Sequence, residues 1–180
     1  MSLIKNSLIA LSCLFIVSCS MLSSPMDGVN DQKVESATIA ETIKTKDLYG
    51  AWAISDEDPV DFLYLAVFLP NHSGLNYLTI DEKDGKPESE YSEYYTWEFN
   101  EKDKIFTMNS FKRTSVINGK APKVEELNEK THYNTQLYML GNEILAIRLT
   151  RPGEKYTFLK MDNATYQNLV RDNPDIPRLK

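Results

Sequence analysis

Cysteine and histidine are scarce in this chain of 180 residues, which contains two of each. Both cysteines, Cys13 and Cys19, lie near the N-terminus, so the remaining chain cannot form a disulfide, a thiol nucleophile or a cysteine-based metal site. His72 and His132 are far apart and match no metal-ligand spacing, and the chain has no Gly-x-Ser-x-Gly motif. We therefore expect no metal, no cofactor and no enzymatic activity.

Basic residues are also in short supply, because 20 Lys and Arg stand against 26 Asp and Glu, for a net charge of −6. Phosphate binding needs clustered Lys and Arg, so we expect no nucleic-acid partner. Long apolar runs are limited to residues 7–18, which follow Lys5. This run is shorter than the roughly 20 residues of a membrane-spanning helix and is typical of an export signal.

The apolar run ends in Ile16-Val17-Ser18-Cys19, which resembles the lipobox of bacterial lipoproteins. The resemblance implies that residues 1–18 are a signal peptide and that Cys19 carries acyl chains that attach the protein to a membrane. Ser20 rather than Asp follows the cysteine, which in that family implies the outer membrane, with the domain facing the periplasm. We expect a lipid-anchored protein of the cell envelope, with residues 19–46 as a polar, flexible tether.

From residue 47 onward, short segments rich in aromatic and β-branched residues alternate with polar turns. The predicted strands are 48–54, 61–69, 75–80, 91–99, 104–117, 131–140, 143–150 and 155–161, with a turn over 81–87 and a bend near Asn109-Ser110. They predict an all-β fold, an eight-stranded antiparallel up-and-down barrel over residues 47–161. Asp162 can cap a short helix, so residues 162–180 are expected to form a C-terminal helix and tail. Its apolar stripe should cover the outer face of strand 61–69.

The first strand begins with Gly50-Ala51-Trp52, which resembles the Gly-x-Trp signature of lipocalins. Lipocalins are eight-stranded barrels with a helix after the last strand, and the resemblance covers residues 47–161. It implies that Gly50 lets the Trp52 ring tuck under the barrel and close its floor. The family usually stacks an arginine on this ring, and here Lys160 stands in that place.

Two functions remain open for such a lipocalin-like domain. The first is binding of a small hydrophobic molecule or a lipid tail inside the barrel. The residues expected to face inward and line such a site are Phe62, Tyr64, Phe68, Tyr95, Trp97, Leu145, Ile147 and Phe158. The alternative for these bulky side chains is that they simply fill the interior.

The second function is that of an interaction module that contacts a basic protein through an acidic, aromatic surface. The candidate residues are Glu88, Glu90, Glu93 and Glu98, which are interleaved with tyrosines and Trp97. Glu93 shares the inward face of its strand with Tyr95 and Trp97, so it needs a partner or water at the rim. Ser73-Gly74-Leu75-Asn76-Tyr77 also resembles a Ser-Gly-x-x-Tyr motif of membrane-bound lysozyme inhibitors, although Ser-Gly is equally common in hairpin turns.

Overall fold

The structure is a computed structural model that describes residues 30–55, 62–80, 88–173 and 176. Cys19, the predicted signal peptide and the predicted turn over 81–87 lie outside these residues. The strands are β1 (Thr38–Ile39), β2 (Gly50–Ser55), β3 (Phe62–Phe68), β4 (Ser73–Ile80), β5 (Ser89–Asn100), β6 (Ile105–Ile117), β7 (Lys123–Leu140), β8 (Glu143–Arg151) and β9 (Glu154–Lys160). Two short 3-10 helices, η1 (Gln32–Val34) and η2 (Thr45–Leu48), precede β2, and helix α1 (Asn163–Asp172) follows β9.

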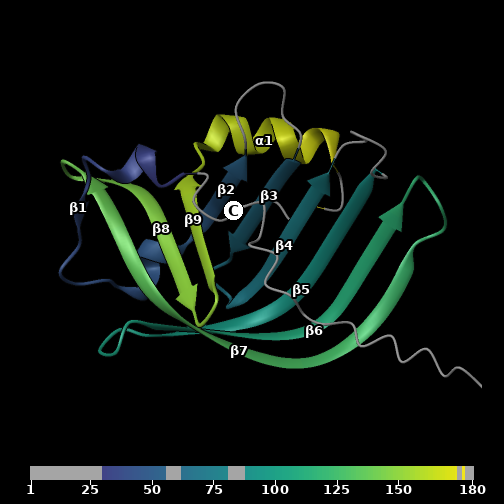
Figure 1. The fold of residues 1–180 in the computed structure, drawn as a ribbon, viewed down its shortest axis with the longest axis horizontal. Coiled ribbons are helices and arrows are strands. Elements are labelled where there is room, and N and C mark those ends of the chain that lie inside the picture. Colours follow the sequence, from purple (N-terminus) through teal and green to yellow (C-terminus); the bar gives the residue numbers. More distant parts are fainter. Residues whose placement is uncertain (1–29, 56–61, 81–87, 174–175, 177–180) are drawn as a thin grey trace, which may run out of the picture.

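Strands β2 to β9 form a closed antiparallel barrel in which each strand pairs with the next along the chain. The barrel closes where β9 returns to β2, with Trp52 opposite Lys160 and Ala53 opposite Leu159 (Figure 1). The eight-stranded up-and-down barrel with a short C-terminal helix, predicted from the sequence, is confirmed. β1 lies outside this ring and pairs with the end of β7.

The strands β5, β6 and β7 are longer than the others and project beyond the rest of the barrel (Figure 1). β7 begins at Lys123 rather than at the predicted residue 131, because residues 123–130 pair with β6 despite their polar sequence. Neighbouring strands can impose extended structure where local propensity is weak. The bend expected near Asn109-Ser110 is confirmed by a register shift between Ser110 and Lys112.

The N-terminal part of the chain that the structure describes packs against the barrel, so the predicted flexible tether does not extend to residue 46. The Asn30 amide donates hydrogen bonds to the carbonyls of Thr157 (2.8 Å) and Ala53 (3.3 Å). The Asp31 carboxylate accepts hydrogen bonds from Arg148, Lys155 and Thr157. Val34 and Ile43 are buried in apolar clusters of the domain. These isolated apolar residues show no periodicity, which explains why the sequence suggested a tether.

Helix α1 lies across the outer face of β2, β3 and β4 (Figure 1). The predicted cap is confirmed, because the Asp162 carboxylate accepts the Thr165 backbone N–H at 2.9 Å. Tyr166 and Val170 are buried against Leu65, Val67, Leu75 and Tyr77. The expected contact with the outer face of the second barrel strand is therefore present. Within the described residues, no helix has both the length and the apolar character needed to cross a bilayer.

The floor of the barrel is closed by Trp52, which is completely buried and donates its indole N–H to the Leu48 carbonyl at 2.8 Å. The Lys160 Nζ lies 3.9 Å from the centre of a Trp52 ring and donates to the Tyr49 carbonyl. A Cβ on Gly50 would lie 2.7 Å from this Nζ, and Gly50 has a φ of 125°. Glycine is therefore required here both by the backbone conformation and by the close approach of the lysine. Burial lowers the pKa of Lys160 to about 8.

Candidate functional site

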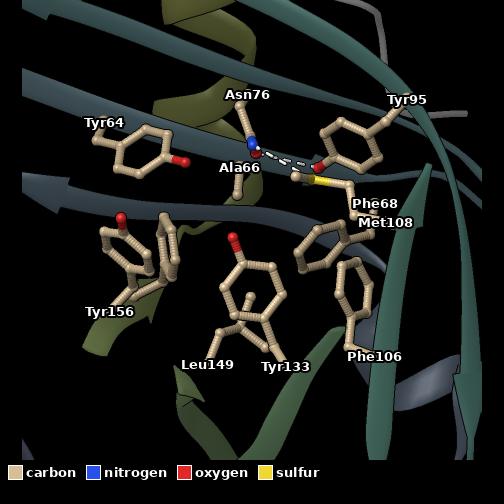
Figure 2. A pocket seen from close by; sticks show the side chains of 11 residues that line it. Tyr64, Ala66, Phe68, Asn76, Tyr95, Phe106, Met108, Tyr133, Leu149 and Tyr156 are labelled. Atoms are coloured by element: carbon tan, nitrogen blue, oxygen red, sulfur yellow. Dashed lines mark hydrogen bonds between the residues drawn. The ribbon is translucent and has the colours of Figure 1, made fainter. Parts of the chain in front are cut away.

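The deep interior of the barrel is filled by aromatic side chains (Figure 2). The rings of Trp97 and Phe106 are stacked with centroids 5.7 Å apart, and Phe68 lies 4.9 Å from Phe106. The pocket among these rings, lined by residues from Tyr64 to Phe158 that the structure describes, has space of only about 10 Å³ for a water-sized molecule. A single water needs about 10–15 Å³ of such space, so the deep interior cannot hold a lipid tail.

Most residues predicted to line the barrel do face its interior. Phe62, Tyr64, Phe68, Tyr95, Trp97, Ile147 and Phe158 all belong to the inner apolar cluster or pack against it. Leu145 is the exception, because it packs outside the barrel against the cluster of Val34, Tyr138 and Ala146. A register shift at Tyr138 and Met139 breaks the alternation, so Ile144 takes the inward position instead. The prediction that Leu145 lines the interior is therefore wrong.

A second hollow opens above the filled interior, at the end of the barrel where β5 and β6 project. It has a volume of about 220 Å³ and is lined by Tyr64, Asn76, Leu78, Tyr91, Glu93, Arg113 and Tyr156. We call this space the mouth hollow. Strand register brings the residues together, because Tyr64, Leu78 and Tyr91 are neighbours across β3, β4 and β5. Asn76, Glu93 and Arg113 form a second row across β4, β5 and β6.

An ion pair lies in the wall of the mouth hollow. The Arg113 guanidinium donates from Nε (3.2 Å) and Nη2 (2.8 Å) to one carboxylate oxygen of Glu93. The other oxygen of Glu93 accepts the Ser110 hydroxyl. Hydrogen bonding to Glu93 raises the pKa of Arg113, so the guanidinium stays charged at neutral pH. Glu93 thus has the partner that its inward position requires.

Three tyrosine hydroxyls gather where the mouth hollow meets the packed interior. Figure 2 shows Tyr64, Tyr133 and Tyr156 around Ala66 with their hydroxyls directed toward the same space. The Tyr64 and Tyr156 rings meet edge to face with centroids 6.0 Å apart. Burial raises the pKa of Tyr133 to about 12 and also raises the pKa values of Tyr64 and Tyr156. All three are neutral phenols at physiological pH.

Sequence reasoning missed Arg113, Asn76 and Tyr156 as members of this site. Tyr156 could have been found, because it alternates with the inward-facing Phe158 along β9. Arg113 could not, because simple alternation from Phe106 and Met108 would have pointed it outward. The extra residue Phe111 in β6 reverses the alternation and turns Arg113 into the barrel.

The acidic surface predicted from four glutamates is divided between two faces. Glu93 points into the mouth hollow, whereas Glu90 and Glu98 alternate with it and lie on the outer face of β5. Along that face, Glu90 and Glu98 are about 27 Å apart at about 3.4 Å per residue. Exposed Glu88 lies just before Glu90, at the same end of β5. The four carboxylates therefore do not converge on a single partner surface.

Gly74 and Tyr77 of the Ser-Gly-x-x-Tyr segment are buried in contacts within the protein. The Tyr95 ring covers Gly74 so closely that a Cβ there would lie 2.1 Å from a ring carbon. Tyr77 is 4% exposed, lies beneath α1 and donates to the Asn173 side chain at 3.3 Å. These residues hold β4 against β5 and against the helix.

A third hollow of about 270 Å³ lies near the start of β6. Its lining comes from Ile39, Ala40, Asp103, Lys104, Asn134, Thr135 and Gln136, and includes no aromatic ring. The mouth hollow, with its tyrosine rings, is better suited to hold a small molecule.

No protein-family model matches the chain, and no curated protein or solved structure matches it. Within the part of the chain that the structure describes, no three His, Cys, Asp or Glu side chains are grouped to hold a metal ion.

Proposed function

We propose that this protein is a lipid-anchored binding protein of the cell envelope that holds a small molecule at the mouth of its barrel. The observation that carries the binding proposal is the contrast between two spaces. The pocket among the interior rings has about 10 Å³, whereas the mouth hollow has about 220 Å³ and combines aromatic faces with polar groups. Concave sites with apolar walls and a few placed polar groups are typical of ligand binding.

The proposed ligand is short, because the rings beneath the hollow block access to the interior. The hollow has a volume of about 220 Å³, which suits one ring with a few substituents rather than an acyl chain. The binding hypothesis drawn from the sequence is thus moved from the deep interior to the mouth.

The lipoprotein part of the proposal is supported by the N-terminal sequence alone. The short apolar run and the Ile16-Val17-Ser18-Cys19 tetrapeptide favour export, cleavage before Cys19 and acylation of that cysteine. Multiple acyl chains give stable membrane attachment, whereas one chain is marginal. The expected location is the periplasmic face of the outer membrane.

Paired cysteine variants test the anchor. Cys19→Ser should abolish acylation and release the protein from the membrane fraction, whereas Cys13→Ser should leave both unchanged. Intact-mass measurement gives the N-terminal residue and the added acyl mass directly. A mature protein that starts elsewhere, or that carries no acyl mass at Cys19, contradicts the anchor.

Amide and side-chain NMR tests the binding site. Chemically diverse fragments of up to about twelve non-hydrogen atoms are titrated into labelled protein, and shifts are mapped onto the structure. We expect the fragments that bind to shift the Arg113 Nε–H signal and the amides of Asn76 and Tyr91.

Arg113→Gln should weaken this binding, whereas Lys112→Gln, the same charge change on the next residue and the outer face, should not. If no fragment shifts these signals, or if both variants behave alike, the mouth hollow is not the binding site.

A further inference from the structure

The charges of the mouth hollow are already paired within the protein. Glu93 accepts two hydrogen bonds from Arg113 and one from Ser110. Arg113 also lies 3.8 Å from a second carboxylate, that of Glu129. A ligand carboxylate would compete with two glutamates for one arginine, and a ligand cation would have to displace that arginine from Glu93. Neither ionic ligand gains a free counter-charge.

The polar groups left for a ligand are neutral. Tyr64 and Tyr156 present phenol hydroxyls with raised pKa values, of which the Tyr156 hydroxyl already donates to the Glu154 carboxylate at 3.0 Å and can only accept a further hydrogen bond. The Asn76 amide nitrogen makes one weak contact, 3.6 Å to the sulfur of Met108, while its oxygen accepts the Tyr95 hydroxyl. Among the residues that the structure describes, the Tyr64 hydroxyl has no hydrogen-bond partner. The Asn76 amide and the two tyrosines line the mouth hollow and suit neutral hydroxyl or carbonyl groups.

The walls of the hollow are flat and apolar. Tyr64, Leu78 and Tyr91 form one row across β3 to β5, and Tyr156 on β9 completes the apolar lining, so a ring in the hollow would contact aromatic faces. The volume of about 220 Å³ suits one six-membered ring with its substituents. The net charge of −6 on the whole chain also repels anions as they approach.

From these observations we infer that the mouth hollow binds a neutral, hydroxylated ring of the size of one hexose. This inference rests on the proposed function and adds the chemical class of the ligand. The ring's C–H faces pack against Tyr91 and Tyr156, and its hydroxyls exchange hydrogen bonds with Tyr64, Asn76 and the Glu93–Arg113 pair. Binding leaves that ion pair intact.

A series of probes with a common size and different charge tests this class. Glucose, glucuronate, glucosamine and cyclohexanol are titrated separately into the full-length Cys19→Ser protein, and the Arg113 Nε–H and Asn76 amide signals are followed by NMR. We expect glucose to bind at least tenfold more tightly than glucuronate, glucosamine or cyclohexanol. Its affinity should not change with salt concentration, because no net charge is neutralised on binding.

Tyrosine variants provide the second measurement. Tyr64→Phe should weaken glucose binding about threefold to tenfold, since it removes a hydroxyl that bonds the ligand and keeps the ring. Tyr156→Phe should have a smaller effect, because its ring remains and its hydroxyl already donates to Glu154 at 3.0 Å. Tyr138→Phe is the matched control, because the Tyr138 hydroxyl lies outside the barrel and contacts Gln136. Circular dichroism and thermal unfolding confirm that all three variants remain folded.

The outcomes separate this inference from the function on which it rests. Tighter binding of glucuronate, glucosamine or cyclohexanol at the same signals overturns the ligand class and leaves the mouth as the binding site. Equal binding of glucose by wild type and both tyrosine variants also overturns the class. Absence of any shift at the mouth, with these probes and with the diverse fragments, overturns both proposals.

Discussion

Replacing Gly50 by alanine places a side chain where two features of the barrel floor exclude one. The backbone φ of 125° is rarely adopted by residues with a Cβ. The added Cβ would lie 2.7 Å from Nζ and 3.3 Å from Cε of Lys160. The lysine must therefore move away from the Trp52 ring and from the Tyr49 carbonyl, which it now contacts.

The expected loss of stability follows from these two effects. Backbone strain at such a position costs about 1–3 kcal/mol. Moving the lysine removes a cation–π contact of about 0.5–2 kcal/mol and a hydrogen bond from a charged group of about 1.5–3 kcal/mol. Part of this second loss is recovered when the ammonium group regains water. We therefore expect Gly50→Ala to lower the free energy of unfolding by about 3–4 kcal/mol.

Gly153→Ala is the matched control. Gly153 also has a positive φ, 81°, but none of the described residues has an atom within 4 Å of its added Cβ. Gly153→Ala should lower the free energy of unfolding only through backbone strain, by about 1–2 kcal/mol. Urea unfolding followed by tryptophan fluorescence gives both values. A Lys160→Ala background should reduce the cost of Gly50→Ala to that of Gly153→Ala.

Equal losses for the two glycine variants would refute this account of the floor. So would a cost of Gly50→Ala that is independent of the residue at position 160. Either result would show that Lys160 can keep its contacts with Trp52 and Tyr49 when residue 50 has a side chain.

Three further predictions concern charge and packing. Burial lowers the pKa of Lys160 from 10.5 to about 8. Between these two pKa values the unfolded chain binds more protons than the folded one, so stability should rise by up to about 1.4 kcal/mol per pH unit from about pH 8 to about pH 10.5. Lys160→Met should abolish this rise in urea titrations, and a rise that persists would contradict the assignment. For Asp31, burial raises the pKa, but hydrogen bonds, first that from Lys155, outweigh burial and leave the pKa lowered. The ionised Asp31 carboxylate therefore stabilises the fold at pH values above its unfolded pKa. This stabilisation is lost as the pH falls through the pKa of Asp31 in the folded protein. Asp31→Asn should lower the free energy of unfolding by about 1 kcal/mol at pH 7 and by less in acid. A difference in thermal stability between variant and wild type that does not change with pH would exclude this role. Tyr166→Ala should lower the free energy of unfolding in urea by about 3–5 kcal/mol, because it leaves a cavity between α1 and the barrel. Gln167→Ala, at an exposed position of the same helix, should leave stability nearly unchanged. Similar effects of these two helix variants would show that α1 is not packed as described.

The barrel was predictable because regular alternation survives through most of its strands. Along 91–99, a period of two correctly placed Glu93, Tyr95 and Trp97 on the inner face. Gly-x-Trp at the start of the first strand correctly indicated a closed floor, with Trp52 completely buried. These signals are local, so a single sequence contains them.

The candidate site was only partly predictable, because strand irregularities reverse the alternation. The extra residue Phe111 turns Arg113 inward, and the shift at Tyr138 and Met139 turns Leu145 outward. Neither irregularity has a glycine that would mark it in the sequence. Docking of Asn30 onto Ala53 and Thr157 was missed for another reason: its partners are distant in the chain, and burial of a polar residue leaves no periodic signal.

We propose that this barrel binds its ligand at the mouth because packed rings fill its interior. Titration of a long-chain fluorescent fatty acid into the full-length Cys19→Ser protein tests it most directly, with energy transfer from Trp52 and Trp97 as the signal. The packed rings predict no saturable binding and no change in the aromatic NMR signals of Trp97 and Phe106. Stoichiometric, saturable binding that shifts those signals would contradict the claim, because it would require the interior to open.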